Sequence, residues 1–167
     1  MNAGAYGGEM KDVLKEVTVM TGDGEIRVIP ASELEMGYRT SIIKKEGYLV
    51  LGATISLKEG NLEEIKALTR ELSEKRTSKQ PLEFPSAGST FKRPEGYFAG
   101  KLIMDSGLRG YQIGGARVSD KHCGFVINAG DATAQDVVAL MDHVTEVVRE
   151  KYGVTLEPEV KFLGDFN

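Results

Sequence analysis

The chain has 167 residues, enough for one domain or two small ones and enough to bury a hydrophobic core. Hydrophobic residues make up 41% and charged residues 28%, which is typical of globular rather than disordered proteins. The formal net charge of -4 gives no basic surface for nucleic acid, and no apolar run has the length of a membrane span. The single cysteine, Cys123, excludes an internal disulfide and fits a reducing compartment.

The chain opens on a glycine-rich stretch, residues 2–8, with no secretory leader and no predicted first strand. Such a stretch is either a loose terminus or the middle of a longer motif. The whole chain carries 20 glycines, a share above the usual value of roughly 7%. We therefore expect many tight turns or close backbone approaches.

Alternating apolar and polar residues over 15–30, with a glycine-rich turn in the middle, predict a β-hairpin. Residues 32–35 have the pattern of a capping box, which predicts one helical turn. A strand follows over 48–57, with a bulge predicted at Gly52.

Asn61 is a suitable N-cap for a helix from Leu62 to about Lys75, whose leucines and isoleucine recur at helical spacing. Residues 76–85 are polar with two prolines, so this segment is the best candidate for a linker.

The second half is predicted to run helix, strand, strand, helix, strand. The helices are expected at 97–106 and from the capping box at 133–136 to Gly153. The strands are expected at 111–118, 124–128 and 154–163. The order suggests a small α+β layer with helices on one face of a mixed sheet.

Residues 85–94 form the first candidate site, because Ser89 lies among small residues and Lys92 and Arg93 could meet a phosphate. The alternative is an ordinary turn with basic neighbours. The segment is not a P-loop or a nucleophile elbow, because neither motif's spacing is present.

Arg39 lies in a loop of small and polar residues and could clamp a carboxylate with two hydrogen bonds, or form a surface ion pair instead. On a final strand, Glu157, Glu159 and Lys161 would share one face, which either is solvated or lines a site. The two histidines and one cysteine have no metal-ligand spacing, so no metal is expected.

Seven short motifs occur in a fixed order, and together they carry a resemblance that none carries alone. They are NAGAYGGE from residue 2, GYRTS from 37, PSAGSTFKRP from 85, GKLI from 100, GLRG from 107, QIGGA from 112 and LEPEVK from 156. The chain is similar in these motifs to the UDP-N-acetylenolpyruvoylglucosamine reductases, and to their compact subclass because the run between Pro94 and Lys101 is short. The resemblance covers essentially the whole chain.

The resemblance implies an oxidoreductase of the bacterial cytoplasm, acting in peptidoglycan precursor synthesis and hence in cell wall biogenesis, cell shape and cell division. The family is a flavoprotein family that uses FAD and NADPH, and its flavin passes hydride to the enolpyruvyl group of the UDP-sugar. Negative charge then develops on the substrate carboxylate, so preorganised donors and one positioned acid are needed.

By resemblance, Ser89 is the proton-donating serine, Arg39 grips the enolpyruvyl carboxylate and Glu159 assists. Glu157 is the alternative for the role of Glu159. The other implied residues border the flavin (Asn2, Gly4, Tyr6 and Arg39) or the substrate (Tyr6, Lys92, Arg93, Arg109, His122 and Lys161). Some relatives carry asparagine at the position of Arg93 and glutamine at that of His122.

Residue 1 runs into a motif that lies midway through the family's flavin domain, so the chain is expected to be a C-terminal part. The expected division is a partial FAD-binding α+β domain over 1–80, followed by a small α+β substrate-binding domain over 85–167. We expect such a chain to be inactive and not to retain FAD. The alternatives are an isolated UDP-sugar-binding module, or a dimer or swap through exposed strand edges in residues 1–57.

Overall fold

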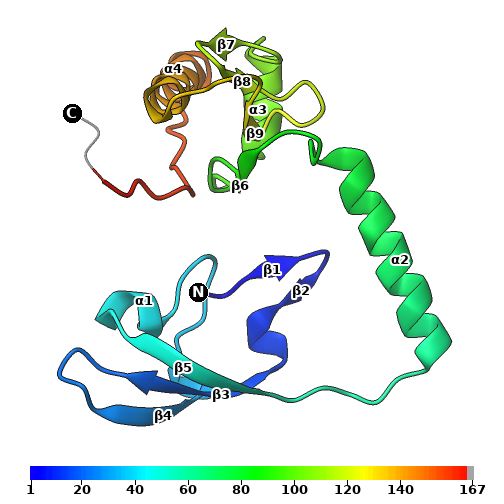
Figure 1. The fold of residues 1–167 in the computed structure, drawn as a ribbon, viewed down its shortest axis with the longest axis vertical. Helices are drawn as coiled ribbons and strands as arrows, with labels where there is room; N and C mark the ends of the chain where they lie inside the picture. Colours follow the sequence, from blue (N-terminus) through cyan, green and yellow to red (C-terminus); the bar gives the residue numbers. More distant parts are fainter. Residues whose placement is uncertain (165–167) are drawn as a thin grey trace. The chain divides into compact units, whose positions relative to one another are not determined.

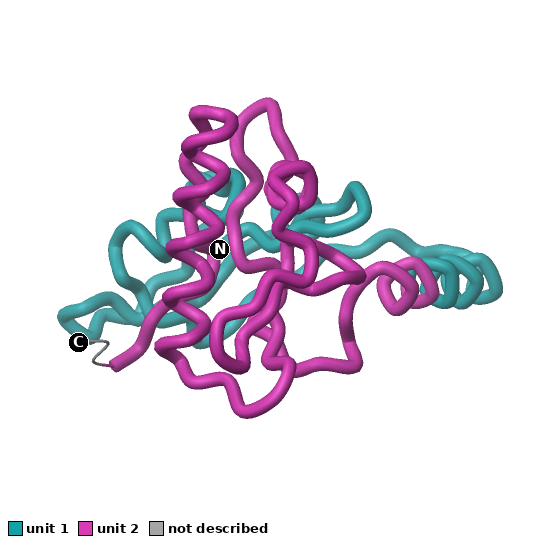
Figure 2. The backbone as a smooth tube through the Cα atoms, turned by 90° about the horizontal axis from the view of Figure 1, so that it is seen from above, with its two compact units in different colours: residues 1–72 teal, residues 73–167 magenta. Residues whose placement is uncertain are grey.

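The computed structural model describes residues 1–164, and its helices and antiparallel sheets confirm the α+β class (Figure 1). The described chain forms two compact units, Met1–Leu72 and a second one from Ser73 onward (Figure 2). Each unit has its own sheet and its own cluster of buried side chains. The assignment of flavin and substrate roles to residues 1–80 and 85–167 stays a prediction.

The first unit contains a small hairpin, a three-stranded antiparallel sheet in the order β4-β3-β5, and short helical turns. Its elements are β1 (Gly4–Ala5), β2 (Gly8–Glu9), a 3-10 turn (Met10–Asp12), β3 (Leu14–Met20), β4 (Ile26–Pro30), a 3-10 turn (Ala31–Glu33), α1 (Ile42–Glu46) and β5 (Leu49–Ile55). The hairpin of β1 and β2 and the helix α1 were not predicted. The glycine-rich start is therefore an ordered element in this structure.

The predicted hairpin over 15–30 is confirmed by the antiparallel pairing of β3 with β4. The strand over 48–57 is confirmed as β5, and its register against β3 shifts between Val50 and Gly52, as a bulge requires. The capping box at 32–35 is wrong in detail, because the 3-10 turn follows Pro30 and no side chain caps it.

The core of the first unit is small. Val17 and Val19 of β3 are buried with Ile29 and Leu34. The opposite face of the sheet is open, because Ile26 and Val28 pair with Met20 and Thr18 on that face and are 64% and 60% exposed.

Helix α2 (Leu62–Lys79) is four residues longer than predicted, so its last turn occupies the start of the expected linker. Its N-terminus agrees with the prediction, since Asn61 Oδ1 accepts hydrogen bonds from the backbone N–H groups of Glu63 and Glu64 at 2.9 and 3.2 Å. None of its residues is buried.

The second unit has a four-stranded sheet in the order β6-β9-β8-β7, and every pairing is antiparallel. The predicted mixed sheet is therefore wrong. Besides the end of α2, the elements are β6 (Ser86–Ser89), α3 (Ala99–Asp105), β7 (Gln112–Ile113), β8 (Ala116–Val118), β9 (Phe125–Asn128) and α4 (Ala134–Tyr152).

The single strand predicted over 111–118 is instead a hairpin of β7 and β8, turning at Gly114 and Gly115. A Cβ at Gly115 would lie 2.2 Å from the carbonyl oxygen of Gly130, so the turn sits directly against the loop that leads into α4. Two adjacent glycines allow this approach, and they interrupt the strand pattern that surrounds them.

The strand predicted over 154–163 does not form. Only an isolated bridge joins Phe91 to Pro158, flanked by hydrogen bonds from Lys92 N to Glu157 O (2.8 Å) and from Glu159 N to Thr90 O (2.9 Å). Phe91 and Pro158 face each other at a position where the paired residues exchange no hydrogen bond, so the proline is tolerated in this bridge.

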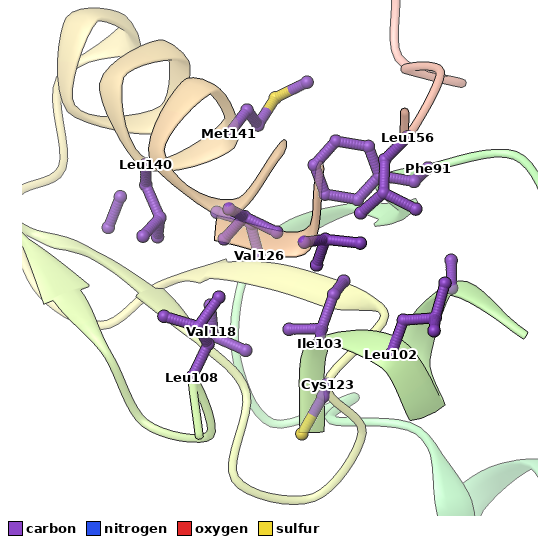
Figure 3. Packing of buried hydrophobic residues seen from close by; sticks show 14 residues of the cluster. Phe91, Leu102, Ile103, Leu108, Val118, Cys123, Val126, Leu140, Met141 and Leu156 are labelled. Carbon is purple, nitrogen blue, oxygen red and sulfur yellow. The ribbon is translucent and has the colours of Figure 1, made fainter. Parts of the chain in front are cut away.

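Helix α4 begins with the predicted capping box, in which Thr133 and Asp136 each bond the other's backbone N–H, and it ends at Gly153 in the left-handed conformation. Its apolar stripe packs with α3 and with Ala116, Val118 and Val126 of the sheet in one buried cluster. Figure 3 shows Leu140 pointing from α4 toward the strands that carry Val118 and Val126.

Candidate functional site

A polar pocket of about 470 Å³ lies in the first unit, between the hairpin β1–β2 and the loop that contains Arg39. It brings together residues more than thirty positions apart, including all four that the resemblance places at the flavin. Its lining is Asn2, Gly4, Ala5, Tyr6, Gly7, Gly8, Glu9, Lys11, Asp12, Tyr38 and Arg39.

Two tight turns present aromatic and cationic side chains to this pocket. Tyr6 and Gly7 connect β1 to β2 with φ angles of 51° and 85°, so a tyrosine occupies a position that favours glycine or asparagine. Tyr38 and Arg39 lie between Gly37 and Thr40, which form a two-residue bridge, and Arg39 has a φ of 56°. Left-handed backbone at non-glycine residues is costly and clusters at binding sites.

The floor of the hairpin is fixed by Asn2, which is 2% exposed. Its amide nitrogen donates to Glu9 Oε2 at 2.8 Å, and its amide oxygen accepts from the Lys11 backbone N–H at 3.0 Å. Lys11 Nζ lies 2.7 Å from the same Glu9 oxygen. Bonds from Lys11 and Asn2 hold the pKa of Glu9 below its ordinary value, and the charge of Arg39 acts in the same direction.

Arg39 stacks over the ring of Tyr38, with its guanidinium carbon 5.3 Å from the ring centroid. Together with Lys11, it places two cations at a pocket whose walls include glycine backbone. Such a combination can bind a carboxylate or a phosphate, because a guanidinium offers paired donors to planar or tetrahedral oxyanions.

The second unit holds the other candidate residues, and Ser89 and Glu159 lie on adjacent segments of it. Ser89 is exposed at the end of β6, where it pairs with Phe125. The next residue, Thr90, is buried and accepts the Glu159 backbone N–H. The hydroxyl of Thr90 accepts from Val126 N at 2.9 Å, which locks this segment to the sheet.

Glu157, the alternative to Glu159, forms an ion pair with Lys92. The two residues also pair through their backbones, so this carboxylate is engaged within the segment. Since the strand over 154–163 is absent, Glu157, Glu159 and Lys161 do not form the continuous strand face that was predicted. Lys161 is exposed and follows the bridge.

The remaining cationic candidates are on the surface of the second unit. Arg93 lies over the ring of Phe98, 4.0 Å from its centroid, and its Nε is 3.4 Å from Tyr97 O. Arg109 donates to the backbone oxygen of Asp120, and its other terminal nitrogen is 3.0 Å from Met104 Sδ.

His122 packs edge-on against Phe125 with ring centroids 5.0 Å apart, and its Nδ1 accepts from Gly124 N at 3.1 Å. The neighbouring Cys123 is buried, and burial raises the pKa of its thiol. Cys123 is therefore a packing residue here rather than a nucleophile.

Sequence reasoning missed seven lining residues of the first pocket, and four of them carry charged or aromatic side chains: Glu9, Lys11, Asp12 and Tyr38. The motif NAGAYGGE contains Glu9, and its position after two glycines was the available signal. Among residues 1–164, no group of three or more His, Cys, Asp or Glu side chains is arranged to hold a metal ion. No helix of that part is long and apolar enough to cross a membrane.

Comparison with protein families gives a match over residues 80–163 to the C-terminal domain of UDP-N-acetylenolpyruvoylglucosamine reductase. Curated relatives with that enzyme name include one from Lachnoclostridium phytofermentans, 63% identical over 99% of this chain, and one from Agathobacter rectalis, 60% identical over 99%. The chain covers 53% of each, so it spans about half the length of these relatives.

The structure is also similar to a crystal structure of UDP-N-acetylenolpyruvylglucosamine reductase (MurB) from Thermus caldophilus. The TM-score is 0.80 and the sequence identity 38%, and the match covers 95% of this chain and 57% of the other. The family match covers residues 80–163 and therefore none of the residues that line the pocket.

Proposed function

The chain belongs to the UDP-N-acetylenolpyruvoylglucosamine reductase family, and we propose that it serves the reduction of UDP-N-acetylenolpyruvoylglucosamine to UDP-N-acetylmuramate in the bacterial cytoplasm. In this proposal FAD mediates the reaction and NADPH is the reductant. The chain spans about half the length of its relatives, so it contributes a defined set of residues to that reaction.

The observation that carries the proposal is the pocket in the first unit. Asn2, Gly4 and Tyr6 come from one motif and Arg39 from another, and all of them line it. The family resemblance assigns these residues to the border of flavin and substrate. Their convergence supports that assignment, because the motifs alone say nothing about distance.

The lining fits part of a flavin and an adjacent carboxylate. When bound, FAD supplies the hydride. Tyr6 can cover an aromatic edge, the glycines leave backbone groups accessible, and Arg39 can hold the enolpyruvyl carboxylate with two parallel hydrogen bonds. A fixed guanidinium there would stabilise the negative charge that develops as hydride arrives.

In this proposal Ser89 donates a proton to the substrate. The proton goes to the enolpyruvyl carbon next to the one that receives hydride. A serine hydroxyl is a weak acid, so it transfers a proton only to a strongly basic, carbanion-like partner and from a fixed position. The locked Thr90 segment supports such a position, and Glu159 pairs with that segment through its backbone.

In this proposal five further side chains contact the UDP-sugar: Arg109, Lys161, Lys92, Arg93 and His122. Lys92 is ion-paired with Glu157, and Arg93 stacks on Phe98. Arg93 and the Glu157 carboxylate are exposed, and ion pairs at exposed groups are weak, so a pyrophosphate or sugar could replace these partners at small cost.

The test is Ser89→Ala in an active reductase that contains this sequence, with Ser86→Ala on the same strand as the control. We expect the oxidation of reduced flavin by the UDP-sugar to slow by roughly 10²- to 10⁴-fold. Flavin reduction by NADPH should stay at the rate of the unsubstituted enzyme. Equal losses in both half-reactions would contradict the proton-donor role of Ser89.

We propose further that the 167-residue chain by itself is not competent. The described pocket is built by one hairpin and one loop, whereas binding sites for cofactors usually bury most of the ligand surface. Purified chain should show no flavin spectrum and should not oxidise NADPH. A yellow protein with bound FAD would contradict this.

The alternative function is a UDP-sugar-binding module. It is favoured by the buried cluster of the second unit, which gives the predicted substrate residues a folded scaffold. Calorimetry of the chain with UDP-N-acetylenolpyruvoylglucosamine tests it. No heat at a ligand concentration of about 1 mM, which corresponds to about 4 kcal/mol of binding free energy, would exclude useful binding.

Association of two chains is the remaining proposal. In the first unit β4 and β5 are edge strands, and Ile26, Val28 and Leu51 on them are more than half exposed. Exposed apolar edges favour pairing with another chain. Light scattering should give a dimer mass, and Val28→Lys should shift it toward the monomer; a monomer at all concentrations would contradict the proposal.

A further inference from the structure

Glu9 stands where the hairpin β1–β2 meets the 3-10 turn that follows it. Its carboxylate accepts from the Asn2 amide at 2.8 Å and pairs with Lys11 Nζ at 2.7 Å through the same oxygen. Its backbone N–H donates to Asp12 Oδ2 at 2.7 Å.

The partner Asn2 is the buried element of this arrangement. Both polar atoms of its side-chain amide are used: the nitrogen donates to Glu9, and the oxygen accepts from the Lys11 backbone N–H. The backbone between them is tied by a hydrogen bond from Met10 N to Ala3 O at 2.8 Å. Removing the Glu9 carboxylate would leave a buried amide donor without its acceptor, which is more costly than losing an exposed ion pair.

The hairpin held in this way carries the pocket residues. Gly4 pairs with Glu9, and a Cβ on Gly4 would approach Glu9 Cγ to 3.0 Å, so the side chain of Glu9 lies against the first strand. Ala5 pairs with Gly8, which leaves Tyr6 and Gly7 as the turn. The position of Tyr6 over the pocket therefore depends on the closure of the hairpin at Glu9.

We propose that Glu9 is a positioning residue of this pocket: it clamps Asn2 and Lys11 and thereby fixes the strained turn that sets Tyr6 opposite the Arg39 loop. The role of Glu9 in holding the hairpin is argued from its contacts with Asn2 and Lys11. Its role in orienting flavin and substrate rests on the proposed function. Glu9 itself does not take part in hydride or proton transfer.

The clamp is tested without any ligand, by amide hydrogen exchange on the 167-residue chain. In Glu9→Ala, the Lys11 and Met10 amides should exchange roughly tenfold or more faster, because a hydrogen bond to a charged group is lost. The backbone resonances of Tyr6 and Arg39 should shift. Glu33→Gln, at an exposed carboxylate of the same unit outside the pocket lining, is the control and should change neither.

Glu9→Gln distinguishes the effect of the Glu9 charge from the effect of its side-chain volume, because glutamine has nearly the same size but no charge. Its carboxamide oxygen can still accept from Asn2, but it cannot pair with Lys11 as a charge. We expect the protection of Lys11 to lie between the wild type and Glu9→Ala, and the Tyr6 and Arg39 resonances to return most of the way.

The pH profile gives a second readout. Lys11 and Asn2 hold the pKa of Glu9 below its ordinary value of 4.5, so the charged clamp is complete above that value and is lost as the pH falls through the lowered pKa. Wild-type protection factors should approach those of Glu9→Gln in acid, and the Glu9→Gln protection factors should change less with pH, because Asp12 is the only carboxylate of this arrangement that remains in the variant.

Unchanged protection and unchanged Tyr6 and Arg39 resonances in Glu9→Ala would overturn the proposal. If Glu9→Ala unfolds the first unit, seen as lost protection at Val17 and Val19, the other variant decides. Equal protection in the wild type and Glu9→Gln across the pH range would then overturn it. These measurements use no ligand, so they are separate from the test of the proposed function, which is the effect of Ser89→Ala on the oxidation of reduced flavin by the UDP-sugar.

Discussion

The two units differ in how much of their structure rests on buried side chains. In the described chain, 14 buried residues form the cluster of the second unit, whereas Val17, Val19, Ile29 and Leu34 form that of the first. The first unit also exposes large apolar residues on the open face of its sheet. A unit with so few buried side chains depends more on its hydrogen bonds and turns.

This difference coincides with where the strained backbone lies. Three of the four non-glycine residues with positive φ, Tyr6, Glu35 and Arg39, are in the first unit, and two of them line its pocket. The first unit thus holds its proposed ligand groups on tight turns, and the second holds its candidates at the margin of a packed sheet. Substitutions should therefore act through packing in the second unit and through local geometry in the first.

The largest effect is expected from Leu140→Ala in the second unit. Leu140 is fully buried, and such truncations cost about 2 to 5 kcal/mol of unfolding free energy. Chemical denaturation followed by hydrogen exchange should show the loss in α4 and β9, with the β3 amides unaffected. Leu82→Ala, at a half-exposed leucine of the same unit, is the control and should cost less than about 0.5 kcal/mol.

An equal loss of protection in β3 would break the comparison, because the two buried clusters would then unfold together. Retention of stability in Leu140→Ala would show that the cluster is not the main source of stability in the second unit.

The sequence predicted elements whose signals are local. Helix α4 follows from its stripe of valines, Leu140 and Met141 between the Thr133 capping box and Gly153, and the β3–β4 hairpin follows from alternation around a glycine turn. Elements that depend on distant partners were missed or wrong. Whether residues 154–163 form a strand is decided by what lies beside them, and the structure gives only the bridge from Phe91 to Pro158.

For the candidate site, too, the sequence predicted individual residues from local motifs but not which of them lie together. Tyr6 and Arg39 could be named from motifs, but their presence in one pocket depends on the fold of the first unit. Glu9 was missed because its importance lies in contacts with a buried asparagine, and burial of Asn2 is not visible in a polar, glycine-rich stretch.

Gly115→Ala should give the next largest effect. Its Cβ would lie 2.2 Å from Gly130 O and 2.4 Å from Ala132 N, both backbone atoms that cannot swing away. Overpacking of this kind costs roughly 1 to 3 kcal/mol. Thermal unfolding should show the loss, and Gly22→Ala, where a Cβ meets nothing within 4 Å, should not.

A loss in Gly22→Ala equal to that in Gly115→Ala would contradict the steric explanation. The two variants compare the two units directly, because Gly115 lies in a turn of the second unit packed against the start of α4, whereas Gly22 lies in a turn of the first unit with open space around it.

Val19→Ala tests the small cluster of the first unit. Val19 is fully buried, and the loss of two carbons at about 0.8 kcal/mol each, with a small cavity, predicts about 2 kcal/mol. Within residues 1–164, the cluster of Val19 has three other buried hydrophobic residues, so this change should remove protection from the whole β3–β4–β5 sheet. Exchange of the β3 amides measures it, and Val28→Ala on the open face is the control. Loss confined to β3 itself would show that the sheet does not unfold cooperatively.

The smallest effect concerns acid stability of the second unit. Hydrogen bonds from the backbone N–H groups of Thr133 and Gly115 hold the pKa of Asp136 below its ordinary value of 3.8. A lowered pKa in the folded state contributes stability above the ordinary value and loses it as the pH falls through the lowered one. The melting temperature of the second unit should therefore fall in acid by less in Asp136→Asn than in the wild type. Asp142→Asn, exposed on the same helix, should follow the wild type. Identical acid profiles for the wild type and Asp136→Asn would show that the charge at this cap does not stabilise α4, and the difference between the units would then rest on packing alone.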